Sequence, residues 1–261
     1  MEPTLLTTRD DGVATVTIHH PAKRNAMTPD MWHRLPALLQ DLAADAGVRA
    51  LVLTGAEGTF CAGADISALR APADGGPAQA QQGMAVAAEE ALAAFPKPTL
   101  AAVRGYCVGG GCQLAAACDL RFASEDALFG ITPAKLGIVY AASSTERLVR
   151  LVGPSAAKYL LFSGELIDAA RALRTGLVDE VHPGDGLQGR VEDFARRLTT
   201  RSALTQAAAK EFADGRTGPD RIAHWQRESA ACAEAAEGVT AFLERRAPQF
   251  NWPRGTGSSA R

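Results

Sequence analysis

The sequence carries no excess of either charge, because 27 Lys and Arg residues face 29 Asp and Glu residues and leave a net charge of −2. Such a chain lacks the broad positive field that holds nucleic acid or an anionic membrane. We therefore expect any anionic partner to be held by a few local cations. The 261 residues, 47% of them hydrophobic, suffice for a full core, which excludes disordered and fibrous classes.

Cysteine is scarce and lacks paired spacing, which argues against a disulfide scaffold and a zinc site. We expect reduced, mostly buried thiols in a cytoplasmic protein without a metal. We expect neither a signal peptide nor a membrane span, because the apolar stretch 98–118 is interrupted by Arg104 and a glycine cluster. The five cysteines are Cys61, Cys107, Cys112, Cys118 and Cys232.

Common nucleotide and nucleophile motifs are also missing. After Gly109-Gly110-Gly111, position 114 is Leu where a dinucleotide-binding turn needs Gly, and Gly111 stands where a P-loop needs Lys. There is no Gly-x-Ser-x-Gly elbow, and the five histidines are scattered along the chain. The pattern argues against a Rossmann site, a P-loop and a serine hydrolase.

Hydrophobic periodicity predicts an α/β core followed by a helical C-terminal third. Thr28 and Pro29 form a helix start, and Gly47 marks its end, with Pro36 inside. We expect a core over 1–195, a helical oligomerisation region over 196–254 and a flexible tail over 255–261, with 71–80 as a mobile loop over a site. The expected strands are 13–18, 50–54, 99–103 and 120–123, and the expected later helices are 112–118, 154–162, 168–174, 187–200, 203–213 and 221–246.

Two glycine-containing segments, 60–65 and 105–112, each follow a predicted strand and lead into a helix. Small residues let a ligand approach the backbone, and amides at helix N-termini point outward as donors. Two such amides that converge on one carbonyl oxygen form an oxyanion hole. The alternative is that both segments are tight turns packed for structural reasons.

These segments carry a resemblance to the crotonase superfamily, the enoyl-CoA hydratase/isomerase family. The matching stretches run in one order through 20–27, 60–65, 97–119, 162–164, 170–178 and 241–246. The resemblance implies a crotonase-like spiral of ββα units, a homotrimer or hexamer, and binding of an acyl-CoA thioester, so that coenzyme A is part of the substrate and no separate cofactor is needed. It places the oxyanion amides on Ala64 and Gly110, and coenzyme A contacts on Ala22, Lys23, Arg24, Ala62, Ile66 and Arg245.

The sequence departs from the family at its acids. Family hydratases carry two glutamates where this chain has Gln113 and Pro133, and some isomerases carry an aspartate that aligns with Ala141. Neither Gln nor Pro can act as a base. Ordinary hydration and isomerisation are therefore put in doubt.

The run 129–140 resembles methylmalonyl-CoA decarboxylase-like members, whose active-site tyrosine falls on Tyr140, although we expect Glu rather than Gln113 in that branch. Decarboxylation needs no base, since loss of CO2 itself generates the enolate. The resemblance thus makes Ala64, Gly110, Tyr140 and Gln113 the candidate catalytic residues. For Tyr140 the alternative is an ordinary packed aromatic.

Three functions remain open: a malonyl-type decarboxylase, a hydratase or isomerase with an unusual acid, and a non-catalytic acyl-CoA-binding protein. Glu89 and Glu90 are the first candidates for such an acid, although a solvated helix face is the simpler interpretation of both. Glu146 and Asp126 are weaker candidates, and we expect structural roles for two further acids, Asp65 and Asp119.

Overall fold

The computed structural model describes residues 2–65 and 76–252, with the side chains of 76–81 left out. A six-stranded sheet has the strand order β1-β2-β3-β4-β6-β9. The pair β1–β2 is antiparallel and all other neighbours are parallel. The strands are β1 (Thr4–Asp10), β2 (Val13–His19), β3 (Ala50–Gly55), β4 (Thr99–Val103), β6 (Leu120–Ser124) and β9 (Glu180–His182).

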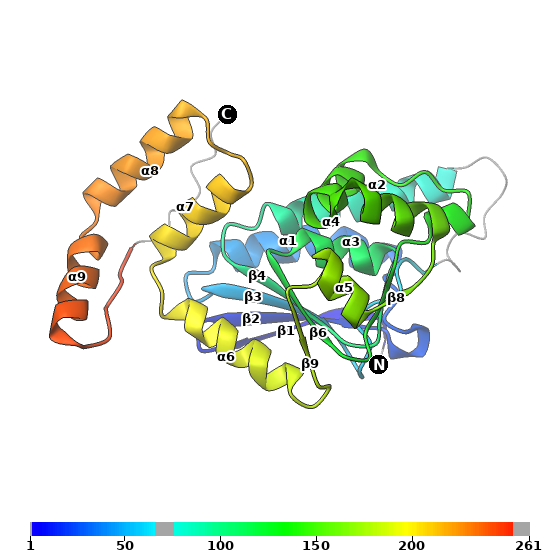
Figure 1. Cartoon of the computed structure of the whole chain (residues 1–261), viewed down its shortest axis with the longest axis horizontal. Helices are drawn as coiled ribbons and strands as arrows, with labels where there is room; N and C mark the ends of the chain where they lie inside the picture. Colours follow the sequence, from blue (N-terminus) through cyan, green and yellow to red (C-terminus); the bar gives the residue numbers. More distant parts are fainter. Residues whose placement is uncertain (1, 66–75, 253–261) are drawn as a thin grey trace.

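Helices cover both faces of this sheet, which explains why β3 and β4 are continuous apolar runs. One face packs against α6 (Leu187–Thr199) through Val52, Leu100 and Phe122. Figure 1 shows α6 on one side of the sheet and the other large helices on the opposite side. Those helices are α1 (Pro29–Ala44), α2 (Gly76–Ala93), α3 (Gly110–Ala117) and α4 (Ala142–Ser163).

A smaller sheet consists of β5, β7 and β8, and β5 leads directly into α3. Its strands have two or three residues each, β5 (Tyr106–Val108), β7 (Leu128–Gly130) and β8 (Ile167–Asp168). They were not predicted, because such short pairings leave no periodicity to read. The remaining short elements are η1 (Pro21–Lys23), η3 (Pro133–Lys135) and α5 (Ala169–Thr175).

The last three helices, α7 (Ala203–Ala213), α8 (Pro219–Ala231) and α9 (Glu234–Glu244), extend away from the sheet at the left of Figure 1. The single helix expected over 221–246 is wrong, because Cys232 adopts an extended conformation and separates α8 from α9. After this break the Glu234 carboxylate accepts hydrogen bonds from Ser202 Oγ at 2.5 Å and Trp252 N at 2.8 Å.

The four predicted strands are confirmed, and so is the helix that begins after Thr28, whose Oγ accepts a hydrogen bond from Met31 N. That helix continues through Pro36 and ends at Ala44. Residues 76–80 begin α2, so the loop expected over 71–80 is wrong there, while 71–75 lie outside the described residues. The helix expected over 154–162 is the second part of α4, after a break at Gly153 (φ 76°).

All five cysteines are free thiols, and only Cys232 is more than marginally accessible. Burial raises the pKa of Cys61 and that of Cys118 to about 12, so both remain protonated at neutral pH. No helix in the described ranges is both long and apolar enough to cross a membrane.

Candidate active site

The two glycine-containing segments lie side by side. Cys61 N donates to Tyr106 O at 2.8 Å, and Val108 N donates to Cys61 O at 2.9 Å, which forms a parallel bridge. The approach requires glycine at 111, because a Cβ there would lie 2.3 Å from Cys61 O. The close backbone contact between the two segments therefore depends on the absence of a side chain at position 111.

This contact brings two backbone amides together at the start of α3. A Cβ placed on Gly110 would lie 3.7 Å from Ala64 N, and a Cβ placed on Gly63 would lie 3.4 Å from Gly110 N. Gly110 is the first residue of α3, where amides have no intrahelical partner. In the parallel bridge between Met27 and Ala64, Met27 N donates to Gly63 O and Asp65 N donates to Met27 O, so the bridge does not use Ala64 N. Neither amide donates to another described backbone group. Two free donors of this kind can hold one carbonyl oxygen.

Ala64 and Gly110 line a cavity of about 110 Å³, together with the other candidate catalytic residues, Gln113 and Tyr140. Among the described residues, neither a carboxylate nor a histidine lines it. The sequence analysis missed Trp32, Gln82 and Ile138, which come from two helices and a loop far apart in the chain. The lining consists of Trp32, Ala64, Gln82, Ala85, Gly109, Gly110, Gln113, Pro133, Ile138, Tyr140 and Ala141.

Tyr140 is partly buried and packs against the main core. Burial raises its pKa well above the usual value, and the negative charge of Glu89 adds to the effect. Its hydroxyl is therefore neutral at physiological pH and available as a donor. Gln82 Nε2 donates to Val139 O at 2.5 Å, which ties the loop that carries Tyr140 to α2.

Trp32 lines the cavity and carries an unpaired buried polar group. Its side chain is completely buried, yet the indole Nε1–H has no hydrogen-bond partner in the described ranges. An unsatisfied buried donor costs about 1–3 kcal/mol, so it requires an explanation. An acceptor on a bound ligand would supply the missing partner.

Glu89 lies directly behind Gln113, and the expectation of a solvated position for it is wrong. Its side chain is 1% exposed, because α2 packs against α3 and because Ser144 and Arg147 of α4 bond to the carboxylate. Gln113 Nε2 donates to Glu89 Oε2 at 2.6 Å, Ser144 Oγ donates to the same oxygen, and Arg147 Nη1 pairs with Glu89 Oε1. The charge of Glu89 is thus offset by Arg147 and stays one hydrogen bond away from the cavity.

The other candidate acids lie outside the cavity. Glu90 is half-exposed and pairs with Arg147 Nη2 at 3.2 Å, while Glu146 forms an exposed pair with Arg150. Asp126 accepts a hydrogen bond from Ser124 Oγ in a turn.

The two acids expected to be structural both make local contacts. Asp119 accepts hydrogen bonds from Thr99 N at 2.7 Å and from Lys210 Nζ at 2.8 Å. Asp65 pairs with Lys23 at 2.7 Å.

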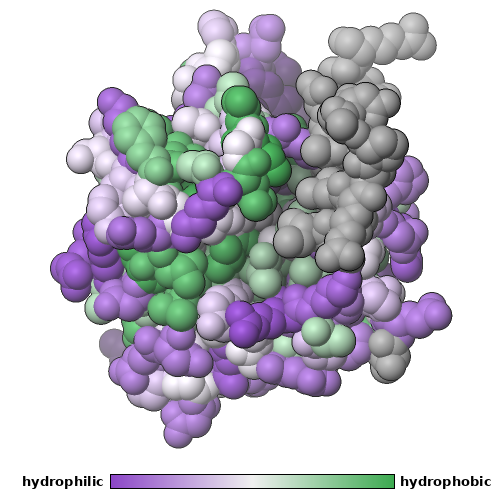
Figure 2. All heavy atoms as spheres, turned by 90° about the vertical axis from the view of Figure 1, so that its right-hand side faces the viewer, coloured by the Kyte–Doolittle hydropathy of each residue, from purple (hydrophilic) through white to green (hydrophobic). Residues whose placement is uncertain are grey.

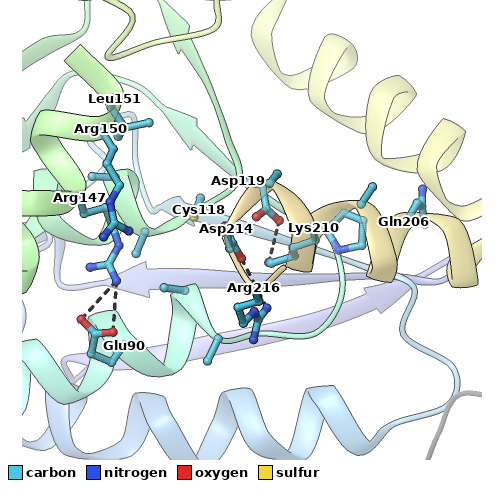
Figure 3. A pocket seen from close by; sticks show the side chains of 18 residues that line it. Glu90, Cys118, Asp119, Arg147, Arg150, Leu151, Gln206, Lys210, Asp214 and Arg216 are labelled. Atoms are coloured by element: carbon cyan, nitrogen blue, oxygen red, sulfur yellow. Dashed lines mark hydrogen bonds and ion pairs between the residues drawn. The ribbon is translucent and has the colours of Figure 1, made fainter. Parts of the chain in front are cut away.

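A larger cleft of about 1010 Å³ lies between α2, α4 and α7. Figure 3 shows Arg147 reaching from α4 to Glu90 and Lys210 reaching to Asp119. Although Arg147, Arg150, Lys210 and Arg216 all line this cleft, each of them pairs with a carboxylate. The cleft therefore offers no unpaired cation to an anionic ligand from among these four.

The predicted coenzyme A loop lies next to the first amide. Ala62 N donates to Arg24 O at 3.0 Å, and the Arg24 guanidinium carbon lies 4.4 Å from the centroid of the Tyr106 ring. Asn25 is completely buried, and its Nδ2 donates to Ala56 O and Thr59 O, which anchors the loop. Sequence reasoning missed this role because those partners lie more than 30 residues away.

Two predicted coenzyme A residues remain, and the structure places only one of them. Arg245 caps α9, which lies away from the sheet in Figure 1. Ile66 lies outside the described residues.

Figure 2 shows apolar surface on the side where α2 and α4 reach the edge of the molecule. The exposed apolar side chains of the neighbouring segments include Leu136, Val139 and Phe162.

The α/β fold, with the two glycine-containing segments side by side before α3, matches solved structures of the crotonase class. The chain belongs to the enoyl-CoA hydratase/isomerase family of that superfamily, whose model matches residues 8–253. The chain is 35% identical over 256 residues to a Mycobacterium tuberculosis protein named as an enoyl-CoA hydratase, covering 95% of this chain and 97% of that one.

Two further similarities support this assignment. The chain is 34% identical over 259 residues to the 2,3-dehydroadipyl-CoA hydratase of Escherichia coli, covering 94% of this chain and 98% of that one. A crystal structure of an enoyl-CoA hydratase/isomerase family protein from Hyphomonas neptunium superimposes with a TM-score of 0.89 at 34% identity, over 95% of this chain and 98% of the other.

Proposed function

We propose that this enzyme decarboxylates a short malonyl-type acyl-CoA thioester. The observation that carries the proposal is the composition of the cavity wall, in which the described residues provide donors and no carboxylate. The volume of about 110 Å³ lies below the range of about 300–1,000 Å³ that is usual for ligand pockets, which suits a short acyl group.

The chemistry follows from the donors. The Ala64 and Gly110 amides form an oxyanion hole for the thioester carbonyl. Loss of CO2 from the malonyl group leaves its electron pair as an enolate, and the two amides stabilise the negative charge on oxygen. The enolate then takes a proton from water, and the hydroxide formed combines with CO2, so the net products are an acyl thioester and bicarbonate. No protein base is needed at any step.

The carboxylate that leaves must be held without being neutralised. The neutral Tyr140 hydroxyl and the unpaired Trp32 indole N–H supply two donors for this purpose, while a glutamate in the wall would repel a second carboxylate. We infer that they orient the carboxylate for loss of CO2.

The test is release of CO2 from malonyl-, methylmalonyl- and ethylmalonyl-CoA by the purified enzyme, with products identified by mass. Turnover of at least one ester supports the proposal. If all three are bound or ignored without release of CO2, the decarboxylase function is lost.

A hydratase or isomerase that recruits an unusual acid is the second candidate. It is favoured by the buried Glu89 carboxylate 2.6 Å from Gln113 and by the hydratase names of the relatives. Turnover of crotonyl-CoA at about 10 s⁻¹, an ordinary enzymatic rate, would support it. Binding of acetyl-CoA without turnover of any ester would instead identify an acyl-CoA-binding protein.

We also propose assembly as a homotrimer or hexamer. On α9, Val239, Phe242 and Leu243 are more than 60% exposed, which is unusual for large apolar residues on one helix. Packing between copies would bury them and would carry Arg245 toward a neighbouring ligand. Light scattering that gives a monomer mass would contradict this assembly.

A further inference from the structure

The side-chain amide of Gln113 is fixed by residues from two other helices. Its Nε2 donates to Glu89 Oε2 at 2.6 Å on α2 and to Ser144 Oγ at 3.1 Å on α4. Ser144 Oγ in turn donates to Glu89, and the Arg147 guanidinium forms an ion pair with the carboxylate. Glu89 and Ser144 are both almost completely buried, so water does not compete with these bonds.

Charge decides which end of the amide faces the cavity. A carboxylate only accepts hydrogen bonds, so the reversed amide would press its oxygen against Glu89. The hydroxyl hydrogen of Ser144 is committed to Glu89 and leaves only a lone pair for Gln113. Both hydrogens of Nε2 are therefore used behind the cavity wall. Gln113 Oε1 accepts no hydrogen bond in the described ranges, and the residue lines the cavity.

We propose that Glu89 is a positioning residue that holds Gln113 Oε1 as a fixed acceptor for a hydroxyl group on the acyl chain. The inference rests on the proposed function in one respect, namely that the Ala64 and Gly110 amides hold the thioester carbonyl. Gln113 follows Gly110 by one turn of α3 and lines the same cavity, so its carbonyl is placed to meet an acyl substituent. The site thus favours hydroxyacyl thioesters over unsubstituted ones.

Gln113 Oε1 also determines which polar group of a substrate lies at each end of the cavity. A carbonyl oxygen repels a carboxylate, so a substrate carboxylate is directed away from Gln113 and toward the donors of Trp32 and Tyr140. A hydroxyl, which donates, is accepted at Gln113. Glu89 determines this division although it touches no ligand.

The experiment compares the affinities of 3-hydroxybutyryl-CoA and butyryl-CoA by calorimetry. The wild type binds the hydroxy ester about threefold to tenfold more tightly, the range for one net hydrogen bond. In Glu89→Gln the neighbouring amide accepts either orientation of Gln113, and the preference falls to about twofold or less. The matched control is Glu90→Gln, which removes a carboxylate from the same arginine but touches no part of Gln113 and keeps the preference.

Circular dichroism confirms that each variant is folded. If Glu89→Gln does not fold, Gln113→Met serves instead, because it removes the acceptor at similar volume and abolishes the preference. Equal binding of both esters by the wild type, or a preference retained in folded Glu89→Gln or in Gln113→Met, overturns the inference and leaves the proposed function standing. A wild type that binds neither ester overturns both.

Discussion

The ring of Trp32 lies against the backbone of Gly110, so close that a Cβ on Gly110 would stand 2.8 Å from Trp32 Cζ2. The same glycine supplies one of the two free amides. Trp32 therefore shapes the donor site from the α1 side and explains why position 110 has no side chain.

Gly110→Pro tests the oxyanion hole, because proline removes the amide hydrogen. The matched control is Gly110→Ala, which introduces the same Cβ contact with Trp32 and keeps the N–H. We expect turnover of a malonyl-type ester by the proline variant to be about 10²–10³-fold below that of the alanine variant. Equal rates in the two variants would show that the Gly110 amide does not stabilise the negative charge that develops on the substrate oxygen.

Trp32→Phe removes the unpaired indole N–H and keeps an aromatic ring. If this group binds the substrate carboxylate, we expect the dissociation constant for malonyl-CoA to rise about tenfold while that for acetyl-CoA changes little. Titration of both ligands by calorimetry gives the comparison. Equal weakening of the two would indicate that the change acts only through packing.

Tyr140→Phe keeps the ring and removes the hydroxyl. Because the raised pKa keeps this hydroxyl neutral, it acts as a donor throughout the physiological pH range. We expect kcat for a malonyl-type ester to fall about tenfold or more, with unchanged binding of acetyl-CoA. Unchanged kinetics would assign Tyr140 to packing alone.

Gln113→Glu tests the contact with Glu89 without any ligand. It places a second carboxyl beside a buried carboxylate, so repulsion and burial raise the folded-state pKa of the introduced group above about 4.3. A raised folded pKa favours the folded state at low pH, and this advantage is lost as pH rises through the folded value. We expect the unfolding free energy of Gln113→Glu to fall between pH 5 and pH 8, relative to the wild type, by about 1 kcal/mol or more.

The double variant Glu89→Gln/Gln113→Glu exchanges the two groups and keeps a single carboxylate. Its unfolding free energy follows that of the wild type across the same pH range, and its carboxylate faces the cavity. We expect it to hydrate crotonyl-CoA at least about tenfold faster than Gln113→Glu at pH 7, since a positioned base contributes about 10²–10⁴-fold. Parallel pH profiles of the single and double variants would contradict the contact.

Local patterns predicted elements next to the amides. β4 was located to the residue, because the run Thr99–Val103, with four apolar residues, lies between Pro98 and Arg104. The helix expected over 112–118 is α3, which begins two residues earlier, at Gly110. The family resemblance then indicated Ala64 and Gly110, and the structure brings them together.

The surroundings of Gln113 were beyond such reasoning. Glu89 lies 24 residues before it and Ser144 lies 31 residues after it, so their contact depends on how three helices pack. On an alanine-rich helix Glu89 looks like a solvated residue, whereas in the structure Arg147 on α4 offsets its charge and Gln113 and Ser144 hydrogen-bond to it. The unpaired Nε1 of Trp32 likewise has no signature in a sequence.

The central claim is that the site makes an enolate by loss of CO2 and contains no base that removes an α-proton. It is tested most directly by incubating the enzyme with malonyl-CoA, and separately with acetyl-CoA, in deuterated water and analysing the thioesters by mass spectrometry. The account predicts release of CO2 and acetyl-CoA that carries a single deuterium, with no deuterium entering acetyl-CoA supplied as such. Absence of CO2, or rapid exchange of the α-protons of acetyl-CoA, would contradict it.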